Sequence, residues 1–166
     1  NILYMTEMRY NEWEFYLWSG EKGYDGITGT FHTVDSEDIP YQGAFAVSTR
    51  IGGSLKGHLI SALKACELVF ILESAKEGRK RLTRISEVFY DEERNSVFAN
   101  DLMRWEEDQS GWTYNNKLTS GLLSKMHKKD VETAGQLQRE LERLSKAKPM
   151  EHPMKESLKS RIVLNE

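Results

Sequence analysis

An acid and a histidine stand at the ends of two short segments near the start of the chain. The first segment, Ile2–Met5, is apolar and leads to Glu7, and the second runs from Ile27 to His32. In an open α/β sheet, ligands bind in the crevice beyond the carboxyl ends of the strands. We therefore expect Glu7 and His32 at one such rim. There the acid can polarise a water molecule or hold a metal ion through water, and the histidine can contact a phosphate.

A plainer interpretation of these two residues involves no chemistry. An acid that follows an apolar run usually ends a strand in solvent, and a lone histidine usually has a structural role. Spacing alone leaves both interpretations open, so the motifs around the two residues have to carry the functional argument.

The elements that must position these residues are predicted as strand, helix, strand. The segment Ile2–Met5 is typical of a buried strand in a parallel sheet. The segment Glu12–Ser19 places aromatic and leucine side chains three and four residues apart, as a short helix does, and Gly20 ends it. The glycines of Gly23–Gly26 then provide the turn into the second strand.

The two segments together resemble the motifs of the secretion and pilus-assembly ATPases. The matching residues are Glu7-Met-Arg9-x-x-Glu12, then Gly23-x-Asp25-Gly26-x-x-x-Thr30-x-His32. This family contains the P-loop motors of type II and type IV secretion, tight-adherence pili and archaeal flagella, and its motif spacing is matched without a gap. Thr6, Tyr24 and Ile27 depart from it, because the family has Gly, His and Ser there. The likeness continues less sharply to about Met103.

The resemblance implies roles for individual residues. Glu7 matches the catalytic acid that orients the attacking water and supports Mg²⁺ through water, and His32 matches the catalytic histidine that lies near the γ-phosphate of ATP. The other matched positions would belong to the cofactor-binding site: Arg9, Glu12, Asp25 and Thr30. ATP and Mg²⁺ are then the cofactors of the complete protein.

The resemblance also implies a fold from which one part is missing. The expected fold is α/β, the C-terminal portion of a RecA-like P-loop NTPase core, with strand–helix–strand, then an antiparallel meander, followed by C-terminal helices. The phosphate-binding sequence G-x-x-x-x-G-K-[ST] does not occur in the chain, and the glycine-rich Gly52–Gly57 lacks its Gly-Lys-Ser/Thr ending. We therefore expect either the C-terminal part of a motor ATPase, inactive by itself, or a stand-alone module.

Helices and then strands are predicted through the middle of the chain. Segments 36–50 and 55–65 predict helices, and Ser54 is a suitable N-cap for the second. The most hydrophobic segment, Glu67–Glu73, predicts a central strand. Strand-like segments then alternate with turns as in an antiparallel meander: Arg81–Tyr90, Ser96–Trp105 and Trp112–Tyr114.

The first hairpin, between the segments Glu67–Glu73 and Arg81–Tyr90, contains four basic residues. Its cations are Arg79, Lys80, Arg81 and Arg84. They face either solvent or the phosphates bound by a neighbouring subunit, and a solvated face is the favoured interpretation.

After Leu118 the chain is predicted to be helical. The expected division is 1–118 as the ATPase core without its phosphate loop, 119–146 as a helical appendage, and 147–166 as a flexible tail with room for one short final helix. Helices are predicted at Ser120–His127 and Asp130–Ser145.

Composition narrows the classes of protein further. The net charge is −3 and the basic residues are not massed on one stretch, which argues against direct nucleic-acid binding. The single cysteine, Cys66, excludes an internal disulfide, and its apolar neighbours indicate a buried thiol. No apolar run approaches the roughly 20 residues of a membrane span.

The resemblance implies a homo-oligomer that forms a hexameric ring. This ring would be cytoplasmic and peripheral at the inner face of the membrane, where it meets a platform protein.

Three functions are thus open from the sequence. The first is a motor ATPase that drives protein or pilin translocation, and the second is a non-catalytic interaction module of a secretion or conjugative-transfer apparatus. The third, a metal-dependent hydrolase using Glu7, Asp25 and His32, is the least favoured because these residues lack metal-ligand spacing.

Overall fold

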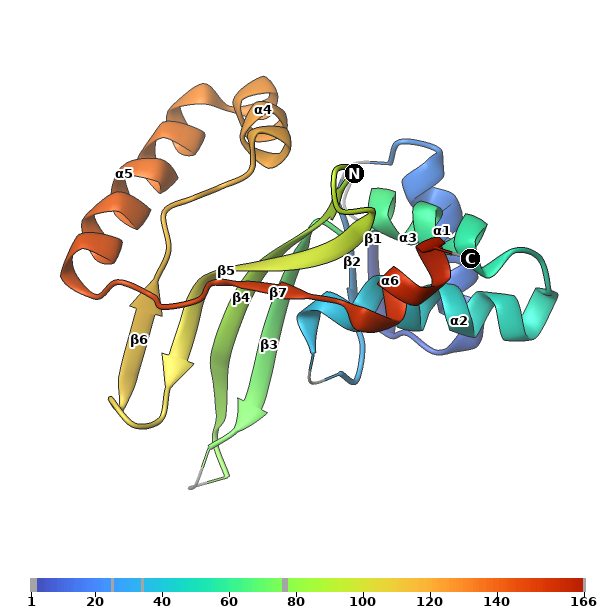
Figure 1. Cartoon of the computed structure of the whole chain (residues 1–166), viewed down its shortest axis with the longest axis horizontal. Coiled ribbons are helices and arrows are strands. Elements are labelled where there is room, and N and C mark those ends of the chain that lie inside the picture. The colour runs from blue at the N-terminus through green and yellow to red at the C-terminus, as the bar shows by residue number, and fades with distance from the viewer. Residues whose placement is uncertain (1–2, 25, 34, 76–77, 166) are drawn as a thin grey trace. The chain divides into compact units, whose positions relative to one another are not determined.

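The fold is described from a computed structural model, which covers residues 3–24, 26–33, 35–75 and 78–165. It is mixed α/β with small sheets, as expected, and Figure 1 shows its elements. In chain order these are β1 (Leu3–Glu7), α1 (Tyr10–Glu21), β2 (Ile27–Thr30), a 3₁₀ turn η1 (Ser36–Asp38), α2 (Ile39–Ile51), α3 (Leu55–Ala65), β3 (Leu68–Ser74), β4 (Lys80–Asp91), β5 (Ser96–Glu106), β6 (Gly111–Tyr114), α4 (Ser120–Lys129), α5 (Val131–Ala147), β7 (Met154–Glu156) and α6 (Leu158–Asn165).

The chain forms two compact units. Unit 1 comprises Asn1–Glu67, Val88–Phe98 and Glu156–Glu166, and unit 2 comprises Leu68–Glu87 and Ala99–Lys155. The expected division at 118 and 146 follows the order of the chain, whereas these units interleave. They do so because the long strands β4 and β5 contribute to both and because the end of the chain returns to unit 1.

Unit 1 begins with the predicted strand–helix–strand. β1 and β2 pair in parallel, with Leu3 opposite Ile27 and Glu7 opposite Thr30, and α1 connects them. The expectation of a buried strand is wrong, because Leu3 is 36% and Tyr4 60% exposed. The physical reason is that the sheet formed here by the described residues has two strands. A complete parallel sheet has more strands, and helices cover both of its faces.

The helices α1, α2 and α3 pack together around Trp13. This side chain is 1% exposed, and its ring meets Tyr16 and Phe31 edge-on at centroid distances of 5.6 and 5.1 Å. A Cβ at Gly43 of α2 would lie 2.6 Å from the Trp13 ring, so only glycine allows this approach. As predicted, Ser54 caps α3, where its hydroxyl accepts a hydrogen bond from the Gly57 N–H at 3.2 Å.

The thiol of Cys66 is buried, as predicted, at the end of α3. Burial raises the pKa of the Cys66 thiol to about 12, helped by the nearby charge of Glu67. Because the thiolate is the reactive form, we expect the folded chain to react with a disulfide reagent such as Ellman's at about pH 8 at least 100-fold more slowly than the urea-unfolded chain. Equal rates in the two states would show that Cys66 is accessible.

The last 20 residues, expected as a tail, contain a strand and the anticipated final helix. Ser157 is fully buried at the start of α6, where its hydroxyl accepts from the Ser160 N–H at 3.1 Å and donates to Asp38 of η1 at 2.8 Å. Lys159 adds an ion pair to the same Asp38 at 2.7 Å. Proline at 149 and 153 suggested disorder, but these polar contacts and the buried Leu164 hold the end of the chain in unit 1.

Ser157→Ala tests this attachment. We expect it to lower the free energy of unfolding by about 2 kcal/mol, because it removes a helix cap and leaves a buried carboxylate without one of its donors. Ser36→Ala is the matched control, since the Ser36 hydroxyl is also buried but has no hydrogen-bond partner among the described residues. Urea denaturation of both variants should show a change within about 0.5 kcal/mol for Ser36→Ala. Equal losses of unfolding free energy in Ser157→Ala and Ser36→Ala would show that the Ser157 hydroxyl does not attach the end of the chain to unit 1.

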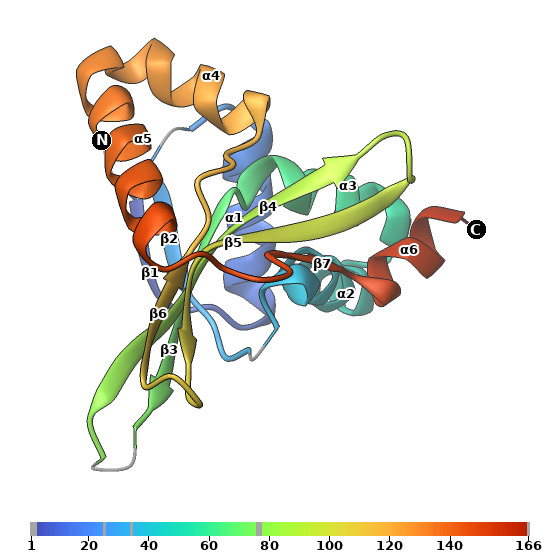
Figure 2. The same cartoon turned by 60° about the vertical axis from the view of Figure 1, so that its left-hand side comes forward.

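Unit 2 contains the predicted antiparallel meander. The strand order is β3-β4-β5-β6, and β7 also pairs with β5 (Figure 2). The prediction that the Glu67–Glu73 segment is central is wrong, because β3 lies at the sheet edge and exposes Phe70 and Leu72 at 55% and 61%. Hydrophobicity indicated a fully buried strand, but only alternate side chains of β3 are covered.

No helix in the described residues is long and apolar enough to cross a membrane.

Candidate functional site

Glu7 and His32 come together in the structure. Glu7 is the last residue of β1, and His32 lies two residues after the end of β2. Because the two strands are parallel, their carboxyl ends lie at the same edge, and His32 Nε2 is 3.7 Å from Glu7 Oε1. The predicted placement of both residues at one rim is therefore confirmed.

Arg9 completes a three-residue group with Glu7 and His32. Its Nε and Nη2 both donate to Glu7 Oε1, at 3.2 and 3.1 Å, so the guanidinium and the imidazole approach the same carboxylate oxygen. Neither a hydrogen bond nor an ion pair to Glu7 Oε2 occurs among the described residues, which leaves that oxygen to solvent. A carboxylate held on one oxygen and open on the other can accept a hydrogen bond from a positioned water.

Glu12 acts on the backbone at this rim. Its Oε2 accepts from the Arg9 backbone N–H at 3.0 Å, at the start of α1. Hydrogen bonds from its own backbone N–H and then from that of Arg9 lower the pKa of Glu12 below its ordinary value. Glu12 therefore fixes the turn from β1 into α1, and with it the direction of the Arg9 side chain. It is a positioning residue in this geometry.

Thr30 ties the ends of the two strands together. Its hydroxyl donates to the Thr6 carbonyl, and the Met8 N–H donates to the Thr30 carbonyl at 2.7 Å. A Cβ on Gly29 would lie 2.4 Å from Met8 Sδ, so glycine is what lets Met8 pack at this point. The contact of Thr6 had no signal in the sequence, because a backbone carbonyl serves and any residue type provides it.

The sixth predicted site residue, Asp25, and the motif departure beside it differ in what the structure says of them. Asp25, expected in the cofactor site, lies outside the described residues. Its neighbour Tyr24, where the resemblance expects histidine, is 61% exposed and has its ring 6.2 Å from that of Trp18. Tyr24 thus extends a row of exposed aromatic side chains rather than the group around Glu7.

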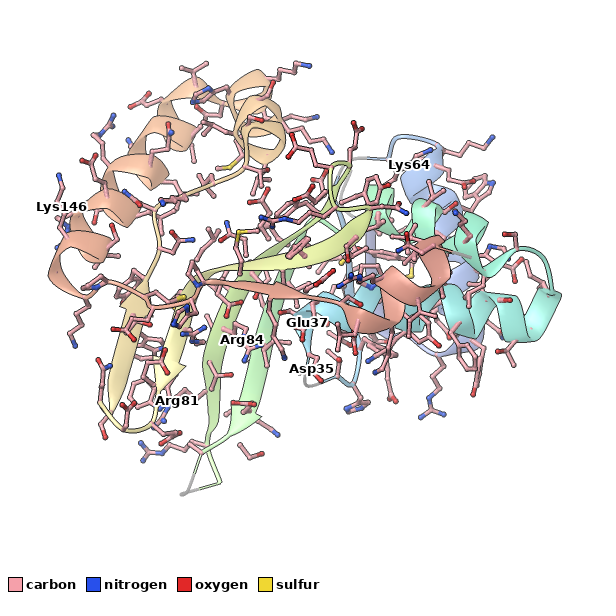
Figure 3. All side chains as sticks on the ribbon, viewed as in Figure 1. Asp35, Glu37, Lys64, Arg81, Arg84 and Lys146 are labelled. Atoms are coloured by element: carbon pink, nitrogen blue, oxygen red, sulfur yellow. The ribbon has the colours of Figure 1, made fainter. Side chains whose placement is uncertain are left out.

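The basic hairpin of unit 2 has partners inside its own unit. Lys80 Nζ donates to the Ser74 hydroxyl at 2.8 Å, and Arg84 pairs with Asp101 at 3.6 Å. Arg81 lies over the Trp105 ring, 4.0 Å from its centroid. Figure 3 shows Arg81 and Arg84 on β4. Lys80, Arg81 and Arg84 thus have partners within unit 2, and nothing in these contacts tests whether the hairpin faces solvent or the phosphates of a neighbouring subunit.

The Glu7 group fits part of a nucleotide site. A single carboxylate suits Mg²⁺ held through water, because this ion keeps several waters and needs few protein ligands. A metal ion held directly by several side chains would need more ligands. The described residues contain no cluster of three or more candidate His, Cys, Asp or Glu ligands. The side chains of Glu7 and His32 are 48% and 92% exposed. The group can therefore orient a water or contact a phosphate that other groups bind.

Two comparisons with known proteins found no match to this chain. No protein-family model matches it, and no curated protein matches it with significant similarity.

Proposed function

We propose that the chain is the C-terminal part of a motor ATPase of the secretion and pilus-assembly class, with a RecA-like P-loop core. The observation that carries the proposal is the 3.7 Å approach of His32 to Glu7 at the carboxyl ends of two parallel strands. The matched motifs place an acid and a histidine at neighbouring strand ends, and this approach supports that placement. In the complete protein, hydrolysis would drive the movement of protein or pilin.

The chemistry would be in-line attack of water on the γ-phosphate of ATP, which depends on positioning and charge rather than on covalent catalysis. Glu7 would orient the water through Oε2, while Arg9 holds Oε1. His32 would donate to the γ-phosphate from the next strand end. Mg²⁺, when bound with the nucleotide, neutralises phosphate charge. The phosphate loop that grips the nucleotide would come from outside this chain.

The exposed strand β1 supports a larger sheet. Parallel sheets occur almost only with both faces covered, yet Leu3 and Tyr4 of β1 are exposed. In a larger sheet such as that of a RecA-like core, helices packed on its faces would cover them. By the same resemblance we propose a hexameric ring at the inner face of the membrane, on a platform protein.

A non-catalytic interaction module is the second candidate. It is favoured by the exposed aromatic row of Phe15, Trp18 and Tyr24, in which the first two rings stack at 5.7 Å. Tyr24 replaces a motif histidine and belongs to this row. A module that docks on another protein would use such a surface and would need neither Glu7 nor His32.

The reading frame upstream of Asn1 distinguishes the two candidates. We expect it to continue for some tens of residues and to contain G-x-x-x-x-G-K-[ST]. The complete protein should then hydrolyse ATP, and the 166-residue chain should not. A start codon directly before Asn1, or ATP hydrolysis by this chain alone, would overturn the proposal.

A further inference from the structure

Unit 2 contains a cavity that the proposed ATPase does not use. It has a volume of about 460 Å³ and lies between the β5–β6 turn and the last turn of α5. Ligand pockets commonly have volumes of roughly 300–1,000 Å³. Aromatic rings and two cations supply most of its lining: Trp105, Trp112, Tyr114, Arg81 and Lys148.

The aromatic walls are held in place before any ligand binds. The rings of Trp105 and Trp112 meet edge-on, with centroids 4.8 Å apart and planes at 75°. The indole N–H of Trp112 donates to the Leu82 carbonyl at 3.2 Å. The backbone of Tyr114 is hydrogen-bonded on both sides, to Lys148 and to Met150, each at 2.9 Å. Such a preformed wall loses little entropy on binding.

Positive charge dominates the cavity. The Arg81 guanidinium lies over the Trp105 ring, 4.0 Å from its centroid, and pairs at 3.6 Å with Glu107, whose side chain is 78% exposed. Lys148 Nζ has no hydrogen bond or ion pair within the described part of the chain. This Nζ atom lies close to Gly111, because a Cβ added to that glycine would be 3.1 Å from Nζ. No acidic side chain is found among the described lining residues. The cavity therefore complements an anion.

Trp105 offers a hydrogen-bond donor without an acceptor. Its indole nitrogen is buried and has no partner among the described residues, in contrast to that of Trp112. A buried donor left unpaired is costly, and such groups in native proteins are rare. Trp105 lines the cavity, so a ligand whose binding opens access to this nitrogen and supplies an acceptor atom would relieve this cost.

We propose that this cavity binds a small organic anion that carries a flat aromatic ring. The ring would pack against Trp112 and Tyr114, and the anionic group would lie between Arg81 and Lys148. An acceptor atom of the ligand would take the Trp105 N–H. The inference is independent of the ATPase proposal, because all these residues belong to unit 2 and none is near Glu7 in the chain.

Indole-3-acetate is a suitable probe, with indole-3-acetamide as its uncharged counterpart. We would titrate each into the ¹⁵N-labelled chain and follow the four indole N–H signals by NMR. The acid should shift the Trp105 and Trp112 signals saturably, leave those of Trp13 and Trp18 in place, and bind about tenfold more tightly than the amide, as one charge-assisted hydrogen bond predicts.

Two lysine variants test the charge. Lys148→Met should remove the preference for the acid over the amide. Lys146→Met is the matched control, because Lys146 lies two residues before Lys148, in the last turn of α5, is paired with Glu142 at 2.7 Å, and lies well apart from Arg81 (Figure 3). It should leave the affinities for the acid and for the amide unchanged.

Trp105→Phe tests the hydrogen bond. This variant keeps a ring but lacks the N–H, and it should weaken binding by about fivefold.

Several outcomes would overturn the proposal. They are an absence of saturable shifts at Trp105 and Trp112, equal shifts at all four indoles, equal affinity for acid and amide, or equal losses in Lys146→Met and Lys148→Met. Lys148 is exposed, so its variant tests the idea even where Trp105→Phe fails to fold.

Discussion

Glu7→Gln in the complete protein is expected to lower ATP turnover by about 100-fold or more while ATP binding stays within about twofold. Glutamine keeps the shape of the side chain and can still accept a hydrogen bond at one oxygen. It loses the negative charge that would polarise water in the proposed mechanism and that lies 3.1 Å from Arg9 and 3.7 Å from His32. Turnover would be measured as phosphate release, and binding by the fluorescence of a labelled nucleotide.

Glu14→Gln is the matched control for this measurement. Glu14 has similar exposure and also pairs with an arginine, Arg50, at 3.2 Å, but it lies on α1 beyond the rim. Its variant should keep full turnover. Normal turnover by Glu7→Gln would remove Glu7 from the mechanism, and equal losses in both variants would point to general destabilisation of α1.

Trp13→Ala is expected to lower the free energy of unfolding by about 3–5 kcal/mol, the range for large aromatic side chains removed from a core. The residue is 1% exposed, and its ring fills the space above Gly43. Alanine would leave a cavity there, because Gly43 has no side chain with which to close it. Urea denaturation followed by far-UV circular dichroism measures this loss without depending on tryptophan fluorescence.

Trp18→Ala removes the same side chain from the same helix, but from its exposed face. Trp18 is 46% exposed and contacts Phe15 and Tyr24. We expect a loss of less than about 1 kcal/mol, as for most surface substitutions. A larger loss for Trp18→Ala than for Trp13→Ala would show that the core of unit 1 is not organised around Trp13.

The positions of helices and strands were predictable because local signals mark them. Ser54 caps α3 as predicted, and Gly52, with φ of 74°, ends α2. Gly78, with φ of 71°, lies in the predicted first hairpin of the meander. These residues act through their own backbone geometry, so their effect can be read without knowledge of distant contacts.

Burial was predicted less well, because it depends on neighbours that are distant in the chain. β1 and β3 are apolar enough to suggest full coverage, yet both expose large side chains. The end of the chain looked disordered, yet Ser157 contacts Asp38, a residue 119 positions away. A contact across such a separation leaves no periodic signal in the sequence.

The sequence by itself determined the order of the helices and strands as far as α5, the strand–helix–strand at the start, and the placement of Glu7 and His32 at the ends of two strands. Periodicity, caps and glycines are local, and parallel strands necessarily place their carboxyl ends together. Only the tertiary structure decided that Arg9 and His32 meet the same oxygen of Glu7, and that Arg81 and Lys148 share a cavity with Trp105. The reason is that side chains from separate elements come within reach of one another only after the elements have packed.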